Sequence, residues 1–153
     1  MFPFESILLF LSAASLGIFL GAQIAEAYLL VPYWKRIPAD EFFEYYSSFG
    51  PSIHKFFAPL TIVATFLPII AGLTGFFTRS GWNPLLWVMS ASTISFFSTY
   101  FLFFKNANLK FENRSISDEE LPAELVRWGN WHWLRILFEA VAFVCSLVLL
   151  LKS

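Results

Sequence analysis

Long uncharged stretches alternate with polar segments along the chain. Residues 6–25, 56–78 and 80–104 contain no Asp, Glu, Lys or Arg. A helix needs roughly 20 mostly apolar residues to cross the hydrocarbon core of a bilayer, which is about 30 Å thick. Each stretch therefore predicts one membrane span. A fourth apolar run, residues 131–151, contains two charged residues but is too apolar for solvent, so we expect it to span with these charges inside or near the membrane.

Turn-forming residues separate these spans. Pro32 is expected to end the first helix, Gly50-Pro51 to close the first loop, and Gly81-Trp82-Asn83-Pro84 to form the next turn. We therefore expect a single integral membrane domain, residues 1–153, with an all-α fold: an up-down-up-down bundle of four transmembrane helices. The expected helices cover about residues 5–31, 54–78, 84–104 and 129–151.

The two long loops carry helical patterns of their own. In the first, residues 38–49 place aromatic side chains at helical spacing opposite acidic ones, which predicts a short interfacial helix lying flat on the membrane. In the second, Ser117 and Glu120 have the spacing of a capping box. This pair is expected to start a helix that continues through Trp128 into the last span.

Composition and charge narrow the classes of partner. The chain is 58% hydrophobic and only 14% charged, so the lipid bilayer is its expected surrounding. Its ten basic residues are scattered among eleven acidic ones, which excludes a nucleic-acid partner. Cys145 is the single cysteine, which excludes an internal disulfide and quinone reduction through paired thiols.

Basic residues are unevenly divided between the two sides of the expected bundle. Most of the Lys and Arg residues fall in the two long loops, whereas Arg79 and Lys152 fall on the side of the termini. Lys and Arg collect on the cytoplasmic side of membrane proteins. The sequence therefore predicts a multi-pass protein with cytoplasmic long loops and both termini outside.

Polar residues recur within the spans. Trp128, His132, Arg135 and Glu139 follow one another at i, i+4, i+7 and i+11, which is one helix face. The cytoplasmic ends of the other spans add further polar residues at the same level: Gln23, Glu26, His54, Asn106 and Asn108. Ionisable groups inside a membrane are costly and often mark a functional path. We therefore expect a polar cluster inside the bundle.

The chemistry of this cluster has two readings. Carboxylate and imidazole groups from different helices are ligands for iron, copper or zinc, so Glu26, His54 and His132 are candidate metal ligands, with a haem between the two histidines as a variant. No paired ligand motif on one turn supports this reading. In the alternative, Arg135 and Glu139 neutralise each other and the cluster only ties the helices together.

Four segments together resemble a known family. They are Gly17-Ile-Phe-Leu-Gly-Ala-Gln-Ile-Ala-Glu26, Val31-Pro32-Tyr-Trp34, Asn106-Ala-Asn108 and Trp128-x-x-x-His132-x-x-Arg135. The chain resembles the anthrone-oxygenase-like family of small four-helix membrane proteins, many of them catalogued only as a domain of unknown function. This resemblance implies an oxygenase that uses molecular oxygen to convert an anthrone-type phenolic ring to a quinone.

The resemblance suggests roles for the polar residues. His132 would act as general base or metal ligand, Arg135 would stabilise an oxyanion, and Glu139 completes the candidate catalytic set. Glu26 and His54 would complete a metal shell or relay protons. Three residues are expected to bind substrate: Asn106, Asn108 and Trp128.

Three functions remain open from the sequence. The first is a membrane-embedded oxidoreductase or oxygenase acting on a hydrophobic aromatic or quinone-like molecule. The second is a non-catalytic scaffold or assembly subunit whose polar cluster is structural. The third is a small oligomeric transporter with Glu26 and Glu139 as proton-coupling groups. Gly17 and Gly21 form a Gly-x-x-x-Gly pattern, which allows close helix packing either within the bundle or in a homo-oligomer.

Overall fold

The described residues, 4–78 and 83–152 of the computed structural model, form an all-helical structure. Four of its helical segments are long and apolar enough to cross a membrane: Phe4–Trp34, Ala39–Thr78, Pro84–Glu112 and Leu121–Leu151. The four predicted spans are therefore confirmed as helices, each longer than the sequence suggested. Two residues of the predicted turn at 81–84, Gly81 and Trp82, lie outside the described part of the chain.

The first segment contains a wide turn that accommodates a proline. It consists of α1 (Phe4–Ala25), the π-helical segment η1 (Glu26–Leu30) and α2 (Val31–Trp34). At the end of η1 the Val31 N–H donates to the Glu26 carbonyl, and Pro32 lies in the first turn of α2. A proline is tolerated there because it needs no N–H partner. The prediction that Pro32 ends the helix was therefore wrong.

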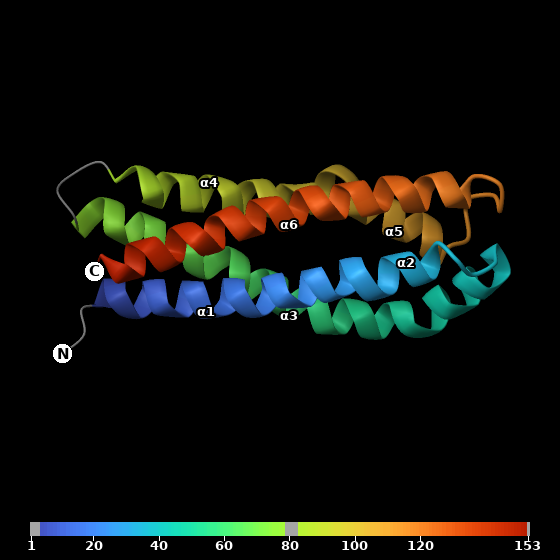
Figure 1. The fold of residues 1–153 in the computed structure, drawn as a ribbon, viewed down its shortest axis with the longest axis horizontal. Coiled ribbons are helices and arrows are strands. Elements are labelled where there is room, and N and C mark those ends of the chain that lie inside the picture. The colour runs from blue at the N-terminus through green and yellow to red at the C-terminus, as the bar shows by residue number, and fades with distance from the viewer. Residues whose placement is uncertain (1–3, 79–82, 153) are drawn as a thin grey trace.

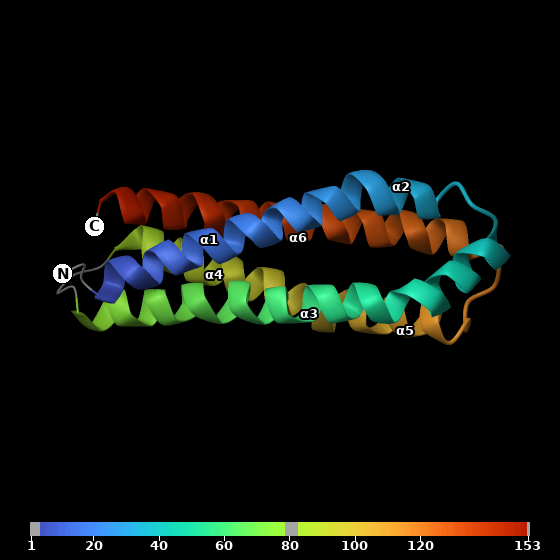
Figure 2. The same ribbon diagram turned by 90° about the horizontal axis from the view of Figure 1, so that it is seen from below.

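The second segment is one continuous helix, α3 (Ala39–Thr78). Gly50 and Pro51 lie inside it, so the prediction that they close a loop was wrong, and residues 39–49 do not form a separate interfacial helix. Figure 2 shows α3 bending in its first third, near this Gly-Pro pair. Proline removes one backbone hydrogen bond and is the usual cause of such a kink.

The third segment contains a second wide turn. Its parts are α4 (Pro84–Thr99), the π-helical segment η2 (Tyr100–Phe104) and α5 (Lys105–Glu112). The side chain of Asn83 caps α4 by accepting a hydrogen bond from the Leu85 N–H at 3.1 Å, which satisfies one free donor at the helix start. The helix therefore begins at the predicted position but runs eight residues past the predicted end at 104.

The last helix, α6 (Leu121–Leu151), begins after the predicted capping box. The backbone N–H of Ser117 donates to the Glu120 carboxylate, and the Glu120 N–H donates to the Ser117 hydroxyl, each at 3.3 Å. The capping box therefore forms as predicted, although the regular α-helix begins only at Leu121, with Glu120 as its N-cap. The helix then runs without interruption past Trp128, also as expected.

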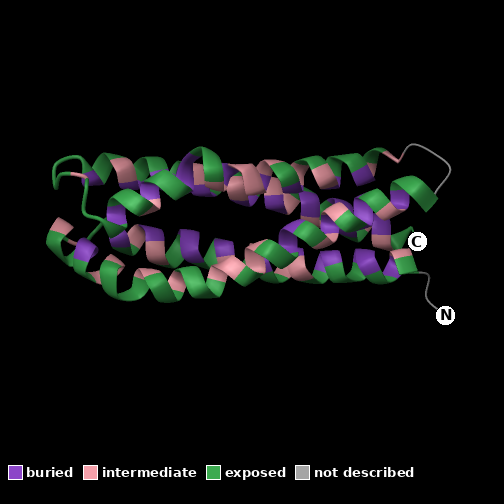
Figure 3. Ribbon diagram, turned by 180° about the vertical axis from the view of Figure 1, so that it is seen from behind, coloured by how far each residue is buried: buried purple, intermediate pink, exposed green. Residues whose placement is uncertain are grey.

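The long helices lie alongside one another, and both ends of the described chain lie at the same end of the molecule (Figure 1). Buried residues face the interior of this arrangement (Figure 3). They form two clusters. One near the chain ends centres on Leu16, Phe19 and Met89; the other, near the loops, is dominated by aromatic residues such as Trp34, Phe42 and Phe104.

Glycines bring neighbouring helices together near the chain ends. A Cβ added at Gly75 would lie 2.8 Å from Leu86, so α3 and α4 pack closely there. A Cβ at Gly17 would lie 3.0 Å from Phe143 of α6, whereas a Cβ at Gly21 would have no described neighbour within 4 Å. Gly17 thus serves packing within the bundle, one of the two expected uses of the Gly-x-x-x-Gly pattern.

Candidate functional site

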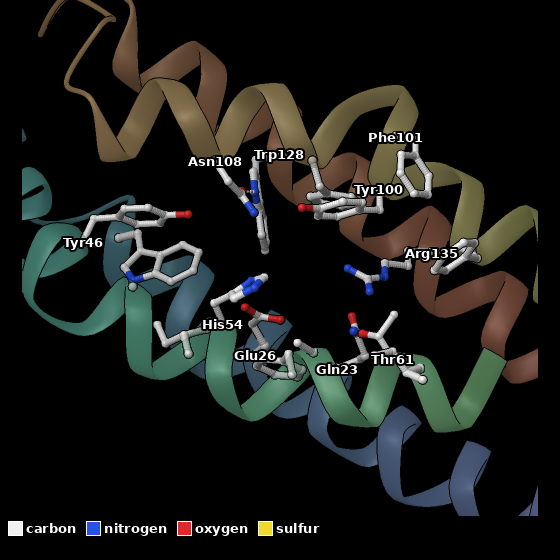
Figure 4. Close-up of a pocket in the computed structure, with 18 residues that line it drawn as sticks. Gln23, Glu26, Tyr46, His54, Thr61, Tyr100, Phe101, Asn108, Trp128 and Arg135 are labelled. Carbon is white, nitrogen blue, oxygen red and sulfur yellow. Dashed lines mark hydrogen bonds between the residues drawn. The ribbon is translucent and has the colours of Figure 1, made fainter. Parts of the chain in front are cut away.

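A pocket of about 270 Å³ lies between the helices, at the level of the two wide turns (Figure 4). This is slightly below the range of about 300–1,000 Å³ for drug-sized ligands, so the space suits a small ring molecule. Most of its wall is aromatic or aliphatic. The lining residues are Gln23, Glu26, Trp34, Tyr46, Gly50, Ile53, His54, Phe57, Ala58, Thr61, Ile62, Phe97, Tyr100, Phe101, Phe104, Asn108, Trp128 and Arg135.

The exposed members of this lining lie on one side. They are His54 and Ile62 of α3 and Phe101 of η2; Ile62 and Phe101 are 54% and 56% exposed. These two residues belong to apolar helices that can cross a membrane. The pocket therefore opens sideways, between α3 and the third segment, where a bilayer would surround the protein.

Figure 4 shows how the polar groups are distributed along the pocket. Arg135 and Gln23 point into one part of it, and Glu26 and His54 into the middle. Tyr46 and Asn108 lie toward the other end. Glu26 and Gln23 are 7% and 1% exposed, so both are held inside the bundle. A buried carboxylate and a buried amide in an apolar pocket are costly, which makes this the strongest candidate for a functional site.

Three aromatic rings, one from the first segment and two from the third, surround the guanidinium of Arg135. Its Cζ lies 5.7, 4.9 and 5.2 Å from the ring centroids of Phe19, Phe96 and Phe104. Rings within about 6 Å attract a cation through their quadrupole. The cage leaves Nε without a hydrogen-bond partner among the described residues. The arginine is thus held in place by rings, with its hydrogen-bonding capacity only partly used.

His132 lies behind the pocket wall rather than in it. The ring is completely buried and does not belong to the lining. Its Nε2 lies 3.0 Å from the Gln23 carbonyl, which can only accept, so Nε2 carries the hydrogen and donates it. The same atom is 3.8 Å from Oε2 of Glu26. His132 therefore supports the segment that carries Gln23 and Glu26, and Glu26 is the group that faces the pocket.

The predicted substrate-binding residues lie partly in the pocket wall and partly on the protein surface. Trp128 lines the pocket and donates from Nε1 to Oδ1 of Asn108 at 3.0 Å, which fixes both side chains. Its indole also stacks on His132, with centroids 4.9 Å apart. Asn106 is exposed and lies outside the lining. Of the three expected substrate-binding residues, the structure thus places two in the pocket wall.

Glu139 is buried but separate from the pocket. It is completely buried, and neither carboxylate oxygen has a hydrogen-bond partner within the described residues. It does not line the pocket. A direct contact with a molecule in the pocket, as expected for a catalytic residue, is therefore not supported.

The predicted metal site is not supported by the geometry. In the described part of the chain, no three His, Cys, Asp or Glu side chains are grouped so that they could hold a metal ion. Glu26 and His54 line the pocket, but His132 does not. Its Nε2 already bonds the Gln23 carbonyl, which also argues against its use as a haem ligand. The described residues around the pocket therefore do not fit the iron, copper or haem expected from the residue types.

The sequence assigned no role in the site to several of the lining residues. Trp34, Tyr46 and Tyr100 read as ordinary interfacial or core aromatics. In the structure the Nε1 of Trp34 is buried in the pocket wall with no partner among the described groups. Tyr100 could have been predicted to line the pocket only if the wide turn η2, which begins at this residue, had been known.

Comparison of the chain with protein-family models, curated proteins and solved structures finds no match. The resemblance to the anthrone-oxygenase-like family therefore stays a prediction from a few motifs.

Proposed function

We propose that the protein is a membrane-embedded oxidoreductase that acts on a hydrophobic aromatic or quinone-like molecule. The observation that carries this proposal is a pocket with aromatic walls, open toward the lipid, that contains a caged arginine and a buried carboxylate. Aromatic walls suit a flat ring by area and by edge-to-face contact. The arginine suits an oxygen on that ring.

The polar groups divide the chemistry between them. Arg135 would stabilise negative charge on a ring oxygen, because guanidinium groups donate strongly to oxyanions. Glu26, which lines the pocket as His54 does, would accept the proton from an activated ring methylene. The methylene carbon would then react with molecular oxygen: CH₂ and O₂ give a ring carbonyl and water. Oxygen, which dissolves well in lipid, is the oxidant in this scheme.

A purely structural role fits the polar groups less well. A cluster that only ties helices together is expected to satisfy its members. Here Gln23 and Arg135 each keep an unpartnered buried atom in the described structure, and both line the pocket. Free hydrogen-bonding capacity facing an apolar space is instead what a ligand site requires.

The proposal includes a membrane topology. The four long segments would cross the bilayer in alternating directions, with the long loops in the cytoplasm and both termini outside. Single cysteines test this in a Cys145→Ser background. Ser117→Cys should react with a membrane-impermeant maleimide only from the cytoplasmic side, and Lys152→Cys only from the outer side. The reverse pattern would invert the orientation.

The catalytic proposal is tested by oxygen uptake in lipid nanodiscs with anthrone as substrate. Wild type should accelerate uptake above empty nanodiscs. Glu26→Gln and Arg135→Met should each lower the rate by about 100-fold, the effect of losing one general base or one oxyanion donor. Arg127→Met is the matched control, because Arg127 also stacks on a phenylalanine of the bundle, Phe103, but lies outside the pocket.

The outcomes separate the alternatives. Equal rates in wild type and Glu26→Gln would remove Glu26 from the chemistry. No acceleration by well-folded wild type, with anthrone or with a substituted hydroquinone, would contradict the oxidoreductase and favour the scaffold. Loss of rate in Arg127→Met as well would point to damaged folding, which a thermal unfolding curve of each variant detects.

A further inference from the structure

The amide of Gln23 is a buried polar group that the reaction described above does not use. Its side chain is 1% exposed and lines the pocket. Neither Nε2 nor Oε1 has a hydrogen-bond partner in the described structure. Buried amides are normally bonded, and each exception calls for an explanation.

The cost of this arrangement is high for a helix inside a bilayer. The mostly apolar wall offers this amide no hydrogen-bond partner among the described residues, and an unbonded buried amide is costly. A methionine or leucine would fill the same space without that cost. A glutamine at this position therefore indicates a bonding partner that binds from the pocket.

The backbone of Gln23 is fixed while its amide is free. The carbonyl of this residue accepts the hydrogen bond from His132 at 3.0 Å, which ties α1 to α6 at this level. Figure 4 shows the side chain pointing into the same part of the pocket as Arg135. The amide is therefore held at a defined place in the wall, with both of its polar atoms unbonded among the described residues.

We propose that Gln23, together with Arg135, forms the subsite that binds the oxygen substituent of the ligand, and that its amide serves both carbonyl and hydroxyl forms. This inference rests on the proposed function, because it takes the ligand to be an oxygen-bearing aromatic molecule. An arginine only donates hydrogen bonds, whereas a glutamine amide donates through nitrogen and accepts through oxygen. Gln23 thus lets one subsite bind a quinone carbonyl in one orientation and a phenolic hydroxyl in the other.

Three probes of similar shape test this subsite. They are 2,3-dimethyl-1,4-naphthoquinone, which only accepts, 1-naphthol, which also donates, and 1-methylnaphthalene, which does neither. The measurement is the amount of probe bound by protein in nanodiscs in excess of the amount partitioned into empty nanodiscs, titrated to give a dissociation constant. The key variant is Gln23→Met, which keeps the size of the side chain and removes both polar atoms.

The matched control is Thr93→Val. Thr93 is also completely buried, but its hydroxyl already bonds the Met89 carbonyl at 2.8 Å, and it lies outside the pocket lining. Gln23→Met should raise the dissociation constants of both oxygenated probes by about five-fold, the effect of losing one neutral hydrogen bond. It should leave 1-methylnaphthalene unchanged, and Thr93→Val should leave all three probes unchanged. Because Gln23→Met removes an unbonded buried amide, its thermal stability should equal or exceed that of wild type.

Each other outcome has a separate meaning. Unchanged affinity of Gln23→Met for both oxygenated probes overturns the subsite, while a wild-type preference for those probes over 1-methylnaphthalene leaves the proposed function standing. A loss for only one probe overturns the dual role of the amide. A wild type that binds all three probes equally, or binds none, overturns the subsite and the proposed function together.

Discussion

Replacing His132 by phenylalanine separates a residue that supports the pocket from one that works inside it. His132 is completely buried behind Glu26, donates to the Gln23 carbonyl at 3.0 Å, and stacks on Trp128 at 4.9 Å between centroids. Phenylalanine keeps the ring and the stacking but loses the hydrogen bond. We expect His132→Phe to fold and to keep quinone-probe affinity within a factor of about two, because one weak tie is lost outside the binding surface.

The magnitude follows from the contacts. The lost hydrogen bond costs about 1 kcal/mol, and removal of the unpartnered Nδ1 offsets part of this. The net loss for His132→Phe is therefore below about 1 kcal/mol, a fall in melting temperature of at most about 4 °C. His132→Ala loses the hydrogen bond and the stacking and leaves a cavity as well. His132→Ala should lower the free energy of unfolding by roughly 3 kcal/mol and the melting temperature by about 6–12 °C.

The assay combines thermal unfolding with probe binding and oxygen uptake for wild type, both His132 variants and Glu26→Gln. The family resemblance makes His132 a candidate general base or metal ligand. A general base at this position would make His132→Phe as inactive as Glu26→Gln. Loss of about 100-fold in turnover at an unchanged melting temperature would refute the placement of His132 behind the wall. Retained turnover in His132→Phe would assign the proton transfer to groups in the pocket.

Three further changes test the packing, the pocket entrance and the surface charges. Gly75→Leu should destabilise the protein by about 1–3 kcal/mol in thermal unfolding, because its Cβ would lie 2.8 Å from a neighbouring leucine. Gly21→Leu should have little effect, since a Cβ there meets no atom within 4 Å in the described part of the chain. Ile62→Trp at the entrance should slow probe association in stopped-flow mixing, whereas Ile70→Trp on the same helix, also exposed and outside the lining, should not. Arg114→Gln should lower the melting temperature at low salt but not at high salt, where surface ion pairs are screened. Because the hydrogen bond to Asp40 raises the pKa of the Arg114 guanidinium above its ordinary value, this contribution should persist at alkaline pH.

The four spans could be predicted because their signal is local and strong. A run of about 20 uncharged apolar residues has few alternatives to a membrane helix. The helix ends were predicted less well. Pro32 and Pro51 are helix stops in water, but here the chain passes both with a wide turn and a bend. Inside a membrane a broken helix exposes backbone groups that lipid cannot satisfy, so helices continue through prolines more readily.

The polar stripe of the last helix was predicted correctly as a buried face. Which of its residues line the pocket and which lie behind the wall was not predicted. His132 and Glu139 are both completely buried, and of the predicted catalytic residues only Arg135 lines the pocket. Residues on one helix face point in the same direction. The groups that each side chain contacts, however, depend on the residues of the opposite helices. That information lies in tertiary packing and is absent from the spacing of polar residues along one helix.

The pocket owes its position to two wide turns that no sequence pattern indicated. Glu26 begins η1 and Tyr100 begins η2, and both residues line the cavity. A π-helical turn places an extra residue in the turn and is frequent at functional sites. Straight α-helices with side chains as large as phenylalanine and tryptophan would interlock and fill the interior. Two segments that widen at the same level instead disturb this fit, so the same large side chains become the walls of a cavity. The aromatic content that reads as core filler in the sequence is thus what gives the site its preference for a flat ring.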